Sequence, residues 1–268
     1  MAKGLVTNTY LTNIGNAIRT KLGVQTTYTP SQMAAAIESI PTGGSNVIDL
    51  TTGVKFAYST FSALPSQIAN ADWSDAVDGR YMFYYCDQLT SFPEIDTSSF
   101  NTMSYMFYRC SSLTSIPLLD TGNVTAMGDT FYGCSALTSI PQFNTSKVYT
   151  MNGTFQGCTS ITSVPLLDTS SVTSMSSLFN GCTNLATVPQ LNTAKVTGSG
   201  MSSMFKNCSS LSNTSLNNIL AMCIAAVKIT NVNYMTLKSI GLSSGQALTC
   251  EGLSNWSAFL AAGWTSGY

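Results

Sequence analysis

The sequence contains no histidine among its 268 residues, and this absence limits the chemistry it can support. Histidine is the most common general base, the usual activator of nucleophilic Ser and Cys, and a frequent zinc ligand. No two of the eight cysteines have C-x-x-C spacing, and no glycine-rich phosphate loop follows a predicted strand. The sequence therefore predicts no enzyme and no cofactor.

Charge is also scarce. Charged residues make up 9% of the chain, and the formal net charge is −1. The Lys and Arg residues are scattered, whereas binding to nucleic acid or to a membrane surface needs a basic patch. The longest apolar stretch, residues 219–227, is too short to span a bilayer. We expect neither a nucleic-acid partner nor membrane insertion.

What the sequence does contain is a repeat, most visible as a cysteine at every 24th residue. Phe recurs three positions before each of these cysteines, and Leu or Ile recurs three positions after it. The cysteines are Cys86, Cys110, Cys134, Cys158, Cys182 and, after a two-residue slip, Cys208. A fixed period of this length is typical of a solenoid, in which stacked copies bury residues that one copy cannot bury alone.

Within each repeat, three local patterns predict structure. LTSIPLL alternates apolar and small polar residues, which predicts a short half-buried strand. MSYMFYRC has the spacing of a helical or 3₁₀ turn that buries Phe and Cys. The opening Asp or Asn, as in Asp96, Asp120 and Asn144, predicts a turn in which the side chain bonds the backbone two residues on.

The repeat cysteines are predicted to be free and buried. Their fixed position between core Phe and Leu columns is typical of a small buried hydrophobe. Adjacent coils bring Cα atoms within disulfide range, but side chains that point in parallel into a tight core have poor disulfide geometry.

The motif F-x-x-C-x-x-L-T-S-I-P resembles the BspA-like class of bacterial leucine-rich repeats, which occurs on surface antigens and adhesins. The resemblance covers roughly residues 72–211. It implies an α/β repeat solenoid, a right-handed leucine-rich-repeat stack of about six 24-residue coils. The flanking sequences add a helical N-terminal module and a helical C-terminal cap. The resemblance also implies a binding role.

The flanks divide the chain further. We expect a helical attachment module at 1–41, a linker and first capping segment at 42–71, the solenoid at 72–214, and a C-terminal helical cap at 215–268. The cap is predicted to contain three short helices, the first capped by Ser215 and the last opened by Ser254 and closed by Gly263. In the attachment module, apolar residues at helical spacing would contact a partner: Leu11, Ile14, Ile18, Met33 and Ile37.

The string LTNIGNAIRTKLGVQTTYTPSQMAAAIESI resembles a short N-terminal segment of bacteriophage structural and appendage proteins. Residues 1–21 lack the apolar run of a secretory signal, which fits a protein made in the host cytoplasm and released by lysis. The resemblance implies localisation in a virion, contact with other virion proteins through this module, and a tail-fibre, tail-tip or head-fibre role. A homo-oligomer is left open.

The best candidate binding site is aromatic. Two surface columns hold tyrosine in the first coils and small or polar residues later: Tyr81, Tyr84, Tyr105, Tyr108 and Tyr132. Core columns stay apolar along the whole stack, so columns that vary are predicted to be exposed. Such tyrosines suit contact with a host-surface protein or a glycan, although they could instead shield the first coil.

Three other interpretations stay open. A capsid decoration protein would use the solenoid to stabilise a lattice, and a bacterial adhesin would need an export route. A glycan-cleaving enzyme would need a carboxylate pair from the acidic residues around the first coil, such as Asp78, Asp87 and Glu94, which a solvated edge explains better. The Asp and Asn column lacks the dense oxygen ligands of a calcium or other metal site.

Overall fold

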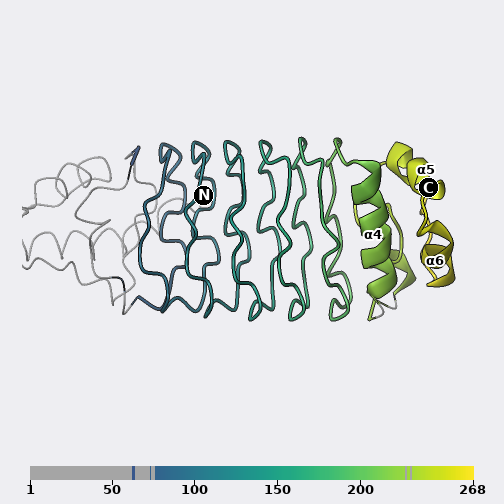
Figure 1. Cartoon of the computed structure of the whole chain (residues 1–268), viewed down its shortest axis with the longest axis horizontal. Helices are drawn as coiled ribbons and strands as arrows, with labels where there is room; N and C mark the ends of the chain where they lie inside the picture. The colour runs from purple at the N-terminus through teal and green to yellow at the C-terminus, as the bar shows by residue number, and fades with distance from the viewer. Residues whose placement is uncertain (1–61, 64–72, 74–75, 227, 230) are drawn as a thin grey trace, which may run out of the picture.

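The structure, a computed structural model, describes residues 62–63, 73, 76–226, 228–229 and 231–268. These residues form a row of stacked coils closed at the C-terminal side by short helices (Figure 1). Nearly all of the predicted linker and the whole predicted attachment module lie outside the described residues, including Leu11, Ile14, Ile18, Met33 and Ile37.

Neighbouring coils are joined by parallel backbone hydrogen bonds along one edge. Isolated parallel bridges start this ladder at Asp78, Thr102, Ala126, Thr150 and Ser174. The Phe83 N–H then donates to the Met106 carbonyl at 2.8 Å. Every second N–H instead closes a turn within its own coil, as from Tyr84 to the Tyr81 carbonyl at 3.2 Å. The segment predicted as a helical turn is therefore a run of turns that also bonds the next coil.

The LTSIP segments differ from the expected strand. Among the described residues, this part of the coil contributes only isolated bridges, such as Ser163↔Thr187. The N–H and the hydroxyl of Thr114 both donate to the Thr90 carbonyl, at 3.1 and 3.0 Å. The proline that follows has no N–H to continue the ladder. Alternation in the sequence thus gives an extended segment with few ladder bonds.

The core consists of columns that run through all the described coils. The Phe rings stack with centroids 5.5 Å apart at Phe83–Phe107 and 6.0 Å apart at Phe155–Phe179. Beside them, the Cys134 thiol donates to the Phe107 carbonyl at 3.1 Å, and the same bond recurs in the other coils from Cys110 to Cys208. All six repeat cysteines are buried and free, as predicted. Burial raises the pKa of the Cys158 thiol to about 12.

From Asp96 onward, the Asp or Asn that opens each repeat forms the expected turn. Asp120 Oδ1 accepts the Gly122 N–H at 2.9 Å, and Asn144 Oδ1 accepts the Ser146 N–H at 3.2 Å. The threonine that follows is buried, a feature that the sequence analysis missed. Its hydroxyl donates to the next coil, as from Thr121 to the Asn144 carbonyl at 2.9 Å. This bond satisfies the buried hydroxyl and fixes the spacing of adjacent coils.

The C-terminal cap contains α4 (Asn213–Ala225), the 3₁₀ helix η1 (Val232–Tyr234), α5 (Ser244–Glu251) and α6 (Trp256–Ala261). Ser212, rather than the predicted Ser215, caps α4. Ser215 is buried, and its hydroxyl donates to the Ala186 carbonyl and accepts the Val188 N–H. In the preceding coil, backbone groups like these bond the next coil. Here Ser215 takes the place of a next coil and thereby attaches the helix to the stack.

One more predicted boundary shifts. The third helix, α6, is capped by Asn255 and not opened by Ser254. Its C-cap is Ala262, and the predicted Gly263 follows directly in the left-handed region at φ 85°. The cap also continues the inter-coil ladder, since the Phe205 N–H donates to the Ile240 carbonyl at 2.8 Å and the Ser203 N–H to the Ser239 carbonyl at 2.7 Å. Backbone groups of the last coil thus find partners in the cap.

Candidate functional site

The turn edge of each coil, residues 81–85 in the first described coil, contains two residues in the left-handed backbone region. In the early coils these include Tyr81 and Tyr85, both at φ 59°, and Arg109 at φ 59°. In a later coil Gly153 and Gly157 take the same positions at φ 59° and 75°, while Ser177, Ser203 and Asn207 take them further along at φ 56°, 55° and 62°. Glycine adopts this conformation freely, whereas other residues are disfavoured there by about 1–2 kcal/mol.

The five tyrosines predicted as a site lie together on the turn edge of the early coils. Tyr81 stacks on Tyr105 with ring centroids 4.8 Å apart, and Tyr84 stacks on Tyr108 at 4.9 Å. Tyr132 extends the second column, 4.5 Å from Tyr108. The predicted alignment of rings from coil to coil is confirmed, and we call these five residues with Tyr85 and Arg109 the tyrosine surface.

The exposure of these rings differs from the prediction. All five predicted tyrosines are half-buried rather than fully exposed. Each ring covers part of its neighbour, as Tyr108 does between Tyr84 and Tyr132, and edge contacts join the columns, with Tyr81 and Tyr84 5.5 Å apart. The surface is thus a rigid aromatic sheet that presents ring edges and hydroxyls to solvent.

Arg109 is the cationic member of the tyrosine surface. Its guanidinium carbon lies 5.6 Å from the Tyr85 ring centroid and 5.9 Å from that of Tyr132. A hydrogen bond with Tyr108 raises the pKa of the Arg109 side chain. Two rings and one hydroxyl therefore hold a permanent positive charge in a fixed place.

Asp129 provides a negative charge at the other side of the surface. Burial raises the pKa of its carboxyl group, and a hydrogen bond with Tyr105 opposes part of that rise. The pKa of Tyr105 is also raised, first by burial and then by the charge of Asp129. At neutral pH Tyr105 therefore keeps its proton, and its hydroxyl donates a hydrogen bond to the Asp129 carboxyl group.

A groove of about 520 Å³ continues from the tyrosine surface along the later coils. Its aromatic end has Tyr85, Arg109 and Tyr132. Gly133, Gly157 and Gly181 line the groove further along, and Asp87 adds a carboxyl group. Gln156 and Asn180 add amides, in the column that holds tyrosine in the early coils. Aromatic rings beside amides and a guanidinium can stack on and hydrogen-bond a sugar or a peptide.

Sequence reasoning missed Tyr85, Arg109 and Asp129. One signal was available: Gly133, Gly157 and Gly181 keep the repeat step in the column of Tyr85 and Arg109. Glycine at a fixed repeat position indicates a left-handed backbone there. A tyrosine or arginine in the same column would then be a residue in a disfavoured conformation and a candidate for function.

Some kinds of site are absent from the part of the chain that the structure describes. No group of three or more acidic or cysteine side chains there could hold a metal ion. No helix within it is long and apolar enough to cross a membrane. Asp78, one of the acidic residues near the first coil, forms an ion pair with Arg80 at 2.8 Å, which leaves it poorly suited to act as a glycosidase acid.

The repeat region matches a known protein family. Residues 52–165 and 154–239 both fit the family described as "Mycoplasma protein of unknown function, DUF285". Together the two matches cover more than half of the chain. The chain belongs to the DUF285 family. Its duplicated match fits the repetition of the coils, and the tyrosine surface lies within the first match. No curated protein and no solved structure matches the chain.

Proposed function

We propose that this chain is a structural or appendage protein of a bacteriophage virion, a tail fibre, tail-tip or head-fibre component, that displays the coil stack for binding to a host or another surface. The observation that carries the binding role is the tyrosine surface. Tyr81, Tyr85, Tyr105 and Arg109 occupy left-handed positions that the later coils give to glycine, serine or other residues. The left-handed positions themselves recur along the described stack, as at Ser177 and Ser203, so the early coils differ from the later ones by their aromatic and cationic side chains.

The binding partner in this proposal is a protein or glycan of the host surface. Stacked tyrosines lose little side-chain entropy on binding, because neighbouring rings already restrict them. Arg109 and Asp129 supply opposite charges that orient a partner. The virion assignment is supported by the resemblance of the N-terminal segment to phage proteins. The proposal also includes the assignment of the coils to the BspA-like leucine-rich repeats and a right-handed winding of the stack.

The first test replaces Tyr84, Tyr108 and Tyr132 with Ser together. Virions that carry the triple variant should adsorb to host cells at least tenfold more slowly. Loss of two stacked pairs should lower stability by about 1–3 kcal/mol, since each such pair contributes about 0.5–1.5 kcal/mol. Circular dichroism should show a folded protein.

Tyr149→Ser is the matched control, because Tyr149 is 53% exposed and lies outside the tyrosine surface. It should adsorb like the parent. Normal adsorption by a folded triple variant would place the binding surface on another face. Equal loss in both variants would mean that the effect is not specific to the tyrosine surface.

Attachment to the virion has its own test. Deletion of residues 1–41 should leave a protein that folds but is not incorporated into virions, because the proposed contacts are Leu11, Ile14, Ile18, Met33 and Ile37. Replacing Ile14 and Ile18 with Asp should give the same defect in the full chain. Incorporation at the parent level would show that attachment lies elsewhere.

A capsid decoration protein is the second candidate, and one observation favours it. Leu118 and Leu166 stand in one column and are 66% and 64% exposed. Exposed leucines on a solenoid face suit contact with a lattice. Leu118→Ser with Leu166→Ser would weaken capsids under this alternative and leave host adsorption unchanged. The family description names Mycoplasma, so a surface protein of a bacterial cell is a third possibility.

A further inference from the structure

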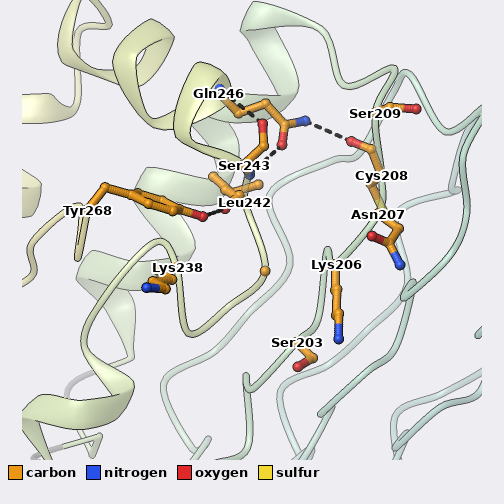
Figure 2. Close-up of a pocket in the computed structure, with 11 residues that line it drawn as sticks. Ser203, Lys206, Asn207, Cys208, Ser209, Lys238, Leu242, Ser243, Gln246 and Tyr268 are labelled. Atoms are coloured by element: carbon orange, nitrogen blue, oxygen red, sulfur yellow. Dashed lines mark hydrogen bonds between the residues drawn. The ribbon is translucent and has the colours of Figure 1, made fainter.

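A second pocket, of about 520 Å³, lies where the last coil meets the cap. Figure 2 shows Lys206, Asn207 and Cys208 on the side of the coil, and Lys238 and Tyr268 on the side of the cap, with Leu242 and Ser243 between them. Ser203, Ser209, Gly241 and Gln246 complete the lining. The pocket is separate from the tyrosine surface and shares no residue with its groove.

The walls of this pocket are held in place without a ligand. Gly241, at φ 96°, packs so closely on the coil that an added Cβ would lie 2.4 Å from the Lys206 backbone nitrogen. The Gln246 amide donates to the Cys208 carbonyl at 2.7 Å and accepts the Ser243 N–H at 2.9 Å. The Tyr268 hydroxyl donates to the Leu242 carbonyl. A preformed pocket loses less entropy when it binds.

The pocket has an excess of positive charge. Lys206 and Lys238 line it, and none of its lining side chains is acidic. Neither lysine forms a salt bridge with a carboxylate within the described part of the chain. The N-terminal end of α5 begins directly after Ser243 and adds the partial positive charge of a helix dipole. In a chain with so few charges, two unpaired lysines here favour an anionic ligand.

The other groups narrow the class of anion. Ser203, Ser209 and Asn207 offer hydroxyl and amide partners, and Tyr268, 59% exposed, offers an aromatic ring. Lys238 Nζ lies 5.5 Å from the centroid of that ring. An inorganic anion would leave most of the volume empty and these groups unused. A sugar has hydroxyls for the polar groups and an apolar ring face for the tyrosine.

We propose that this pocket binds a sugar acid, a monosaccharide unit that carries a carboxylate, with Lys206 and Lys238 on the carboxylate side and Ser203, Asn207 and Tyr268 on the hydroxyls and ring face. The inference does not depend on the tyrosine surface. It adds a second, chemically different contact at the opposite end of the described coils.

The experiment titrates the full chain with glucuronic acid and with N-acetylneuraminic acid, with glucose and inorganic phosphate as comparison ligands, and measures binding by isothermal titration calorimetry, which detects all four ligands. A sugar acid should bind, and glucose and phosphate should bind at least tenfold more weakly. Lys206→Gln and Lys238→Gln should each weaken sugar-acid binding about tenfold. Lys195→Gln, an exposed lysine outside the pocket, is the matched control and should bind like the parent.

Several results would overturn the proposal. Equal binding of glucose would remove the role of the carboxylate, and binding of phosphate alone would leave only a general anion site. Absence of binding by both sugar acids, or unchanged binding in Lys206→Gln and Lys238→Gln, would exclude the assigned pocket. Because both lysines are exposed, thermal denaturation of each variant should match the parent and keep these outcomes interpretable.

Discussion

The early and late coils have the same interior but different turn edges. Phe107 and Phe155 occupy the same core column, and Cys110 and Cys158 donate the same thiol hydrogen bond. At the edge, however, Tyr85 and Arg109 give way to glycine in the next three coils and to Asn207 in the last. The backbone is constant while the side chains displayed on it change. A repeat protein can thus vary its surface coil by coil, because core columns and not edge residues fix the stack.

Unfolding at alkaline pH should test whether the early and late coils unfold as one unit. We expect this change of pH to have the largest effect on the free energy of unfolding. Burial raises the pKa of the thiols at Cys158 and Cys208 to about 12, from 9.0 in an exposed thiol. The folded state then holds more protons than the unfolded state between these values, so stability falls as pH rises from about 9 toward about 12. Below about pH 9 this contribution is fully present.

Chemical denaturation at several pH values measures this effect. One transition should unfold early and late coils together. Cys158→Ala should reduce the slope of the free energy of unfolding against pH by up to one proton. Two separate transitions would instead mean that the halves fold independently, and an unchanged slope would mean that this thiol is not shielded from water.

Truncation of the core should affect both halves alike. Phe131→Ala and Phe155→Ala each remove a fully buried ring stacked between two others. Each should lower the free energy of unfolding by about 3–5 kcal/mol. Urea denaturation measures both. A cost below about 1 kcal/mol in one half would contradict the idea of a common core.

Gly153→Ala should show that the turn edges of the coils differ in their tolerance of side chains, since it places a side chain at a left-handed position next to Asp129. The added Cβ would lie 2.2 Å from Asp129 Oδ1, so the carboxylate must move. We expect a loss of about 1–3 kcal/mol. Gly157→Ala, whose Cβ would meet only ordinary contacts at 3.5 Å, should cost less. Asp129→Gly should recover part of the loss in the Gly153→Ala background; equal costs at both glycines would rule out the clash.

The smallest effect concerns the charge of Asp129. Because burial raises its pKa, the folded protein loses stability as pH rises through the folded pKa of this group. Asp129→Asn keeps a side chain that tolerates left-handed backbone and removes the buried charge. It should stabilise the protein at pH 7 by about 0.5 kcal/mol. The gain should shrink at acid pH; a larger gain in acid than at pH 7 would reverse the sign and contradict this account.

The sequence allowed prediction of the columns but not of the bonds between them. The period placed Phe131 and Phe155 in one stack and Tyr84 and Tyr108 in another, because identical steps superimpose in space. It did not reveal which N–H groups pair, since backbone atoms are the same in every residue. In the structure, most hydrogen bonds between coils lie on the turn edge. The LTSIP segments, despite their strand-like alternation, have only isolated bridges.

The two pockets were also beyond sequence reasoning. The groove is lined by one column of residues that runs from Tyr85 to Gly181. The repeat predicts this column only once its left-handed backbone is known. The second pocket joins Lys206 to Lys238 and Tyr268, residues from the last coil and the cap that no period relates. The tyrosines could be found because their column differs from the constant core columns. The attachment residues remain predictions.

The hydrogen bonds that join one coil to the next have a mechanical consequence. They run along the stack, so tension applied between its two ends would load the junctions between coils one after another. The weakest junction would open first, and each coil that detached would release about 80 Å of extended chain. A filament built this way would lengthen in steps under drag while its remaining coils stayed folded. Each step would dissipate mechanical energy before the load reached the next junction.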